Sequence, residues 1–160
     1  MMKGRTPLFV TLLVILLFLL LPYLAAQGYP DGASGIKADT GSINLVGITV
    51  DELIRRFGAP RSVYAVRGLE EWQDDVVFVY EQGDLYIYKD RVWQVGLKSA
   101  MGIKAGDTRG AVSMILGSAA ETRGNSLFYP VNEFPWPLML RCEFDSSGRV
   151  QVIFIYRTDF

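Results

Sequence analysis

The chain has 160 residues, with 16 lysines and arginines against 17 aspartates and glutamates, no histidine and one cysteine. A net charge of −1 and the lack of a basic stripe exclude an electrostatic surface for nucleic acid. The absence of histidine excludes Ser-His-Asp catalysis, Cys-His catalysis and histidine-ligated zinc, and one cysteine allows no internal disulfide.

Residues 1–26 are predicted to direct export. Lys3 and Arg5 precede an apolar run from Leu8 to Leu21, and Pro22 and small residues follow it, which is the layout of a secretory signal. If the apolar run continues through Pro22 to Ala26, it is 19 residues long and can span a bilayer. A cleaved signal peptide, which we favour, and an uncleaved membrane anchor both remain open. In either case the body of the chain is extracytoplasmic: periplasmic, secreted, or held at the membrane by this segment.

Residues 27–44 are predicted to be a flexible linker, because they are rich in glycine, serine and aspartate and show no apolar periodicity. We expect order to begin near Leu45. The segment from Gly47 to Pro60 then carries the signals of a short helix. Thr49 and Glu52 form a capping box, and Gly58 and Pro60 end the helix. Its apolar face consists of Val50, Leu53, Ile54 and Phe57.

Four β-rich segments follow this helix, at residues 62–66, 76–80, 85–88 and 92–97. If Asp90 and Arg91 form a two-residue turn, Tyr88 faces Trp93 and Tyr86 faces Val95. Tyr86, Tyr88 and Trp93 share one strand face in this arrangement. We expect them to fill the space under the helices.

The helix signature recurs at an offset of 59 residues, where Gly106, Thr108 and Gly117 match Gly47, Thr49 and Gly58. Strand-like segments follow again, at residues 126–131, 138–144 and 150–156. The sequence therefore predicts an α+β fold of two tandem helix-plus-antiparallel-β-meander repeats, at residues 45–100 and 101–160, which form one sheet with helices on one face.

The repeated pattern resembles the SmpA/OmlA family of outer-membrane assembly lipoproteins and the tandem repeats of β-lactamase-inhibitor proteins. The first copy carries the resemblance through Gly47, Thr49, Leu53, Phe57, Gly58 and Pro60. The second copy departs from it at Ala119, where the proline belongs, and the chain has no lipoprotein cysteine. The resemblance implies an exported sheet with helices on one face that binds proteins or assembles envelope complexes. It transfers no functional residue, because its motif consists of helix caps and core positions.

Few residues have the pattern of a catalytic or metal site. Glu70, Glu71, Asp74 and Asp75 could bind calcium or act as an acid/base pair, but their spacing fits no known loop and a solvated loop is favoured. Cys142 shares a strand face with Leu140 and Phe144, which indicates a buried structural thiol. No cofactor is expected.

Three aromatic residues in loop-like segments, Trp72, Phe134 and Trp136, are candidate interface anchors, although folding back onto the core is an equally good interpretation. The leading hypothesis is an exported, non-catalytic protein-interaction module, which resembles an inhibitor or assembly factor and binds another envelope or secreted protein. The alternatives are a small-ligand or glycan-binding domain, which a deep apolar pocket would favour, and a carboxylate-dependent hydrolase that uses residues 70–75.

Overall fold

The computed structural model describes residues 36–37, 40–67 and 75–159, all within one compact unit, Ala33–Phe160. The helices are α2 (Thr40–Ile43), α3 (Val50–Phe57) and α4 (Arg109–Leu116). The strands are β1 (Ile36–Lys37), β2 (Ser62–Val66), β3 (Asp75–Val79), β4 (Asp84–Tyr88), β5 (Arg91–Leu97), β6 (Ser99–Ala100), β7 (Ile103–Lys104), β8 (Glu121–Arg123), β9 (Ser126–Asn132), β10 (Leu138–Phe144) and β11 (Val150–Arg157).

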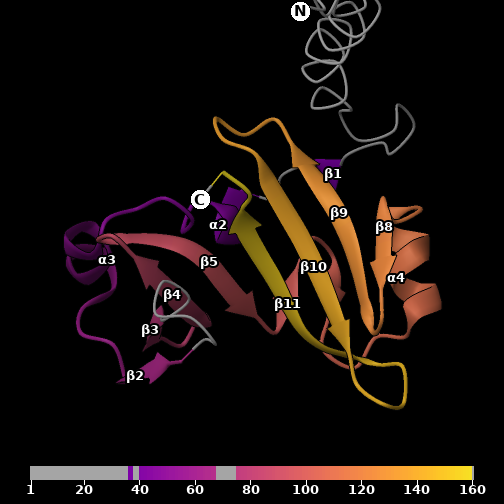
Figure 1. Ribbon diagram of the computed structural model, residues 1–160, viewed down its shortest axis with the longest axis horizontal. Coiled ribbons are helices and arrows are strands. Elements are labelled where there is room, and N and C mark those ends of the chain that lie inside the picture. The colour runs from indigo at the N-terminus through magenta and orange to yellow at the C-terminus, as the bar shows by residue number, and fades with distance from the viewer. Residues whose placement is uncertain (1–35, 38–39, 68–74, 160) are drawn as a thin grey trace, which may run out of the picture. The chain divides into compact units, whose positions relative to one another are not determined.

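One nine-stranded sheet contains most of the strands in the described part of the chain, in the order β1-β9-β10-β11-β5-β4-β3-β2, with β8 paired to β9 off this path. Its strands pair antiparallel, except for the parallel pair β1–β9. In the middle of the sheet β11 pairs with β5, and this pairing joins the strands that precede α4 to the strands that follow it (Figure 1). The segment between β5 and α4 contains a separate small hairpin, β6–β7.

The two longer helices begin and end where the sequence predicts. The hydroxyl oxygen of Thr49 accepts a hydrogen bond of 3.2 Å from the Glu52 N–H, and the hydroxyl of Thr108 accepts one of 3.2 Å from the Ala111 N–H. Gly58 and Gly117 follow the helices with φ of +76° and +82°, which favours glycine. None of the helices in the described residues is long and apolar enough to cross a membrane.

The hydrophobic core lies on one face of the sheet. Leu85, Val95 and Ile155 pair across β4, β5 and β11 and point into it. From the connecting segments and helices, Leu45, Val46, Leu53, Val112 and Leu116 cover these strand residues. The sheet therefore has a core face beneath the helices and an opposite face that faces away from them.

The predicted fold class is wrong. We expected an α+β fold of two tandem helix-plus-meander repeats with helices on one face of the sheet. The described residues instead form a mostly β structure in which the longest helices have eight residues. Ile54 and Phe57, which the apolar pattern assigns to the buried face of α3, are 45% and 38% exposed. Leu53 is the fully buried side chain of this helix, so α3 covers only a small part of the sheet.

The predicted turn and register between β4 and β5 are also wrong. Tyr88 pairs with Arg91, so the turn consists of Lys89 and Asp90, both with positive φ (46° and 65°), as a type I′ turn requires. A β-bulge then makes Trp93 an extra residue of β5 that has no partner on β4. As a result, Tyr86 pairs with Gln94 instead of Val95.

The expectation that Tyr86, Tyr88 and Trp93 fill the space under the helices is wrong for the same reason. Tyr86 pairs with Val77 on β3 and with Gln94 on β5, so the three side chains point to the same side of the sheet. Val77 and Gln94 are buried, but they lie outside the core cluster beneath the helices. Trp93 packs against Tyr156, its partner in an edge-to-face ring contact of 6.4 Å. These aromatic side chains lie on the face opposite the core.

Within residues 27–44, for which the sequence predicts a linker, the structure describes 36–37 and 40–44. Residues 36–37 form β1, which pairs with β9, and Ile43 at the end of α2 is fully buried in the core. The remainder of that segment and the predicted export segment, residues 1–26, lie outside the described residues.

Candidate functional site

An open groove of about 610 Å³ lies where four parts of the chain meet. The segment 44–48 lines one part of it, and α3, the first residue of β5 and the loop between β9 and β10 line the others. A groove of this size is within the range of ligand sites in proteins. Its lining residues are Asn44, Val46, Gly47, Ile48, Glu52, Arg56, Arg91, Glu133, Phe134, Pro135 and Trp136.

Gly47 and Trp136 are in close contact in this groove. A Cβ atom at position 47 would lie 2.6 Å from Cζ2 of the Trp136 ring, and Gly47 has a φ of +94°. The N–H of Gly47 donates a hydrogen bond of 2.7 Å to the Val92 carbonyl, which holds this backbone against β5. Glycine is therefore required here for two reasons, the backbone conformation and the space that the indole ring occupies.

Trp136 also contacts Phe134 and Arg157. The Phe134 and Trp136 rings meet edge to face with centroids 5.6 Å apart, and the Arg157 guanidinium lies 4.9 Å from the Trp136 ring centroid. The same guanidinium holds the pKa of Asp159 below its ordinary value through a hydrogen bond. The indole N–H of Trp136 is buried and has no hydrogen-bond partner in the described structure, which is uncommon for a buried donor.

The loop that carries these aromatic residues is held in an unusual conformation. Glu133 has a φ of +64°, which is uncommon for a residue other than glycine and recurs in binding loops. At the other end of the loop, the Thr158 N–H donates a hydrogen bond of 3.1 Å to the Pro137 carbonyl. Glu133 and Pro135 are exposed between these points, so the loop presents a fixed polar and apolar surface.

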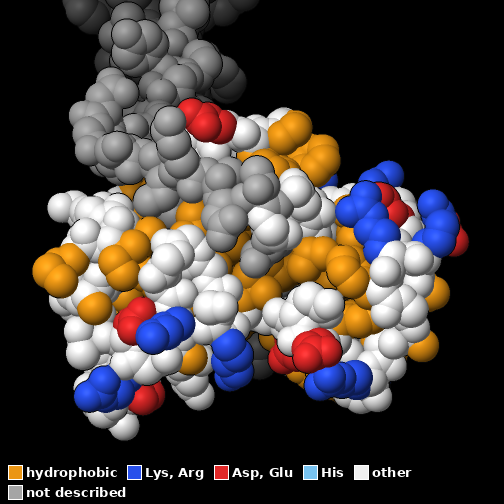
Figure 2. Space-filling view, turned by 180° about the vertical axis from the view of Figure 1, so that it is seen from behind, with side chains coloured by type: hydrophobic (Ala, Val, Ile, Leu, Met, Phe, Trp, Pro, Cys, Tyr) orange, Lys and Arg blue, Asp and Glu red, His pale blue; other side chains and the backbone are white. Residues whose placement is uncertain are grey.

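The charges around the groove are mixed. Arg91 donates a hydrogen bond of 2.9 Å to the Gly47 carbonyl, and Glu52 and Arg56 form an ion pair on α3. Glu133 contributes a further exposed carboxylate. Figure 2 shows a similar mixture on the described part of one face of the molecule, where most lysines and arginines lie beside an acidic residue. The groove is therefore suited to a surface of mixed charge and not to a polyanion.

Of the three predicted anchors, the structure brings Phe134 and Trp136 together in this groove, both partly buried against the core. Trp72 lies outside the described residues. Sequence reasoning missed Gly47, Arg91 and Glu133 as parts of the site. It treated Gly47 as part of a helix motif and Arg91 as a turn residue, and no local pattern indicates that these positions approach Trp136.

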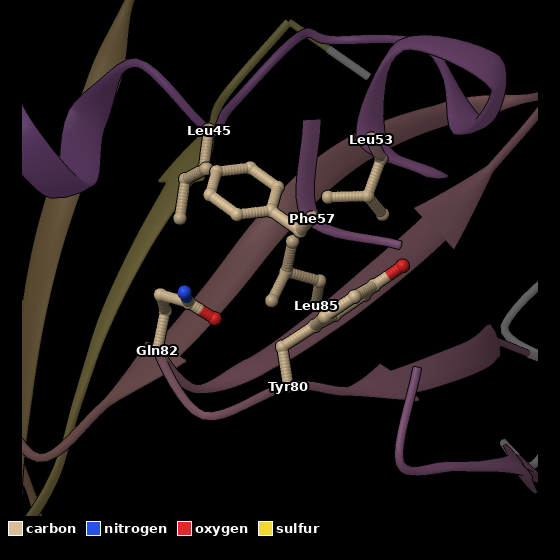
Figure 3. Close-up of a pocket in the computed structure, with 6 residues that line it drawn as sticks. All are labelled: Leu45, Leu53, Phe57, Tyr80, Gln82 and Leu85. Carbon is tan, nitrogen blue, oxygen red and sulfur yellow. The ribbon is translucent and has the colours of Figure 1, made fainter. Parts of the chain in front are cut away.

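A second recess, under α3, is closed. Its six side chains, which converge in Figure 3, are Leu45, Leu53, Phe57, Tyr80, Gln82 and Leu85. They leave no space for a water molecule. The Phe57 and Tyr80 rings meet edge to face at 6.2 Å, and the Tyr80 hydroxyl donates a hydrogen bond of 2.9 Å to the Gly58 carbonyl. These contacts anchor α3 to the sheet.

Two other candidates from the sequence analysis, Cys142 and Asp75, lie in structural environments. Cys142 is fully buried, and burial raises the pKa of its thiol to about 12, which confirms the prediction of a buried thiol. The Asp75 carboxylate accepts a hydrogen bond of 2.9 Å from the Trp93 indole, while residues 70–74 of the acidic segment lie outside the described residues. In the part of the chain that the structure describes, no three acidic or cysteine side chains are grouped to hold a metal ion.

No protein-family model and no curated protein matches the sequence. Among solved structures, the chain is similar to a cysteine-rich secretory protein from Staphylococcus aureus, at 13% identity and a TM-score of 0.50 over 82% of this chain. It is also similar to an extracellular protein containing an SCP domain from Bacillus anthracis, at 12% identity and a TM-score of 0.48, again over 82% of this chain. The chain spans 49% and 48% of those two proteins. The likeness to the first shows a shared fold, and the resemblance to the SmpA/OmlA family stays a prediction.

Proposed function

We propose that this chain is a non-catalytic protein-interaction module that works outside the cytoplasm and binds its partner through the groove at Trp136. The observation that carries the proposal is the contact between Trp136 and Gly47, because it fixes a large aromatic ring at the edge of an open groove. Tryptophan, tyrosine and arginine dominate the energetics of protein interfaces, and the groove combines Trp136 with Arg56 and Arg91.

The shape of the groove supports a protein partner over a small molecule. Small-molecule sites are enclosed and mostly apolar, and they bury most of their ligand. The groove at Trp136 is open and lined by carboxylate, guanidinium and aromatic groups together, whereas the apolar recess beneath α3 has no space for a water molecule. A protein surface with an apolar centre and polar rim fits this arrangement.

Two observations support a location outside the cytoplasm. Residues 1–26 have the composition of a signal peptide or membrane anchor. The Staphylococcus aureus protein that shares the fold is described as secretory, which agrees with export. Fractionation combined with N-terminal sequencing of the mature protein tests this part of the proposal. A soluble extracytoplasmic protein that begins at Gln27 would show cleavage, and a membrane-bound protein that begins at Met1 would show an anchor. Recovery in the cytoplasm would contradict export.

The lack of catalytic groups supports a binding role. The sequence contains no histidine, and the single thiol is buried and protonated at neutral pH. Of the two carboxylates that line the groove, Glu52 is paired with Arg56 on the surface of α3 and Glu133 is exposed.

The groove can be tested by affinity capture of envelope proteins on the full-length chain, with Trp136→Ala and Glu133→Lys as the variants. We expect one set of captured proteins to be lost with both variants. Glu133 is exposed, so its substitution tests the groove even where Trp136→Ala lowers stability. Met114→Ala is the matched control, because Met114 is an apolar side chain on α4 that is 85% exposed and does not line the groove. Capture that both groove variants leave unchanged would contradict the proposal.

A further inference from the structure

The strand β2 forms an unpaired edge of the sheet. It pairs with β3 on one side, and on its other side it pairs with no strand of the described residues (Figure 1). All five of its residues, Ser62–Val66, are exposed. A strand edge of this kind presents backbone N–H and C=O groups that can pair with another chain.

Hydrogen bonds in the neighbouring β3–β4 hairpin determine which groups of β2 point outwards. The Tyr80 N–H donates a hydrogen bond of 3.0 Å to the Gly83 carbonyl, so these two residues form a hydrogen-bonded pair. Hydrogen-bonded and non-hydrogen-bonded pairs alternate along antiparallel strands, so the backbone of Val77 bonds to β2 and not to β4. Its partner Tyr64 therefore bonds to β3, and the two residues beside Tyr64 direct their N–H and C=O groups to the open edge. These two residues are Val63 and Ala65.

The two edges of the sheet differ in how they are protected. Natural sheets guard their edges with short strands, charged side chains, prolines or bulges. On the edge opposite β2, the strands β1 and β8 have two and three residues and contain Lys37, Glu121 and Arg123. The strand β2 has five residues, with no charge, no proline and no register shift. Of the two edges, β2 is therefore the one open to pairing.

Both faces of this edge carry exposed apolar side chains. Val63 is 54% exposed and lies on the same face as Val76 of β3, which is 43% exposed. On the other face, Tyr64 and Val66 are 44% and 38% exposed. These four residues are half of the large apolar side chains that are exposed in the described structure. A strand added at this edge would cover apolar side chains of β2 on both faces of the sheet.

The strand β2 is complementary to a second copy of itself. In an antiparallel pair of copies with Tyr64 on the two-fold axis, Val63 of each copy meets Ala65 of the other, and every outward N–H meets a C=O. An axis at Val63 would instead pair Ala65 with Arg61, whose N–H already donates a hydrogen bond of 2.8 Å to the Val79 carbonyl. The register centred on Tyr64 is therefore the one that uses all the outward groups.

A pair of copies would also close the assembly. Two-fold pairing uses the β2 edge of both copies, and the opposite edge of each sheet is protected, so the assembly stops at two copies. At each end of the paired strands Arg61 lies opposite Arg67 of the second copy, and the ion pair of Arg61 with Glu81, at 3.3 Å, offsets their repulsion. An unrelated strand would have to supply uncharged side chains on both faces, which a second copy brings at every position from 62 to 66.

We propose that two copies of this chain associate through β2, in an antiparallel pair centred on Tyr64 that joins their sheets into one. This contact is independent of the groove at Trp136, because no residue of β2 lines the groove. An interface made by one strand from each copy is small, and small interfaces belong to weak and transient complexes. The association is therefore best detected by trapping it covalently.

The experiment compares disulfide formation in two variants of the full-length chain, Tyr64→Cys and Ser62→Cys, in detergent with an added oxidant. In the proposed register the two copies of position 64 form a non-hydrogen-bonded pair with Cα atoms about 4.5 Å apart, within the range of a disulfide. The two copies of position 62 are displaced along the strands and lie about 14 Å apart, which is too far. The Tyr64→Cys variant is therefore expected to form a covalent dimer at least roughly tenfold faster than the Ser62→Cys variant.

Ser62→Cys is the matched control, because Ser62 is exposed and lies on the same strand and the same face as Tyr64. A thiol reagent is expected to label both introduced thiols equally under reducing conditions. The native Cys142 is buried and does not take part.

Ala65→Pro tests the backbone pairing itself. Proline at this position removes an N–H that points to the open edge and leaves the hydrogen bonds between β2 and β3 in place. Added to Tyr64→Cys, it is expected to slow the formation of the covalent dimer, while circular dichroism shows an unchanged fold. In the chain without introduced thiols, sedimentation in density-matched detergent is expected to show a dimer whose share falls with Ala65→Pro.

The proposal is overturned if the Tyr64→Cys and Ser62→Cys variants dimerise at equal rates, or if neither dimerises although both introduced thiols are labelled. In cells, a disulfide between the Tyr64→Cys variant and a different protein, in place of a second copy, would also overturn it and assign this edge to a strand of that protein. Trp136→Ala is expected to leave dimer formation unchanged, so the groove and the β2 edge can fail separately.

Discussion

The indole ring of Trp136 occupies the space that the side chain of any residue other than glycine would need at position 47. Gly47 also has a φ of +94° and is hydrogen-bonded to β5, so its backbone cannot move away from the ring without losing that bond. The contact between Gly47 and Trp136 therefore fixes the shape of the groove and the positions of the start of α3 and the β9–β10 loop.

Replacing Gly47 by alanine is predicted to destabilise the protein and displace Trp136. The positive φ alone costs a side chain about 1–2 kcal/mol, and overpacking against the ring adds about 1–3 kcal/mol. Gly106→Ala is the matched control, since Gly106 has a φ of +92° and a similar backbone hydrogen bond, to the Val150 carbonyl, but nothing within 4 Å of the added Cβ. Urea unfolding measures both free energies. Equal losses for the two variants would show that Trp136 does not lie against Gly47.

Thr49→Ala and Thr108→Ala are each predicted to lower the free energy of unfolding by about 1 kcal/mol, because each hydroxyl caps the first turn of a helix. Thr122→Ala on exposed β8 serves as the control and is expected to change stability little. Thermal and urea unfolding provide the measurement. If the threonines at the helix starts behave like Thr122, the caps do not stabilise the fold.

Glu133→Gly is predicted to leave stability unchanged or raise it by up to about 1 kcal/mol, because glycine adopts a positive φ without the cost that glutamate incurs. Asn132→Gly, at the end of β9, is expected to destabilise by about 0.5–1 kcal/mol, since glycine weakens a strand. Urea unfolding compares the two. A loss for Glu133→Gly as large as that for Asn132→Gly would argue against the strained loop conformation.

Cys142 is predicted to resist thiol reagents at pH 8 in the folded protein and to react after unfolding, because its thiol is buried with a pKa of about 12. The pKa is higher in the folded state than in the unfolded state, so this group stabilises the fold below pH 9 and the contribution is lost as the pH rises towards 12. Cys142→Ala should lose this part of the alkaline destabilisation. Rapid labelling of the folded protein at pH 8 would contradict the buried position.

The local elements could be predicted from the sequence because their signals are local. Helix caps such as Thr49 and Gly58 and the β-rich segments 62–66 and 138–144 determine elements within a few residues of themselves. The fold class could not be predicted, because the exposure of Ile54 depends on how the short helix meets the sheet. The β4–β5 register was missed because Lys89 and Asp90 adopt positive φ without a glycine.

The candidate site was predictable only in part. Phe134 and Trp136 stand out as large aromatic residues among prolines, which indicates an ordered loop. Gly47 and Arg91 become part of the same groove through tertiary contacts over a long sequence separation, which no local pattern encodes. The position of Tyr86 on the face opposite the core likewise depends on the strand order and on its pairing with Gln94.

Photo-crosslinking in living cells tests most directly whether the groove is a protein-binding site. A benzoylphenylalanine placed at Pro135, an exposed position in the groove, is compared with one placed at the exposed Met114 on α4. We predict a discrete crosslinked product between the Pro135 position and an extracytoplasmic protein, lost when Glu133→Lys is added and absent from the Met114 position. No product at Pro135, or the same product from both positions, would contradict a protein-interaction function for this groove.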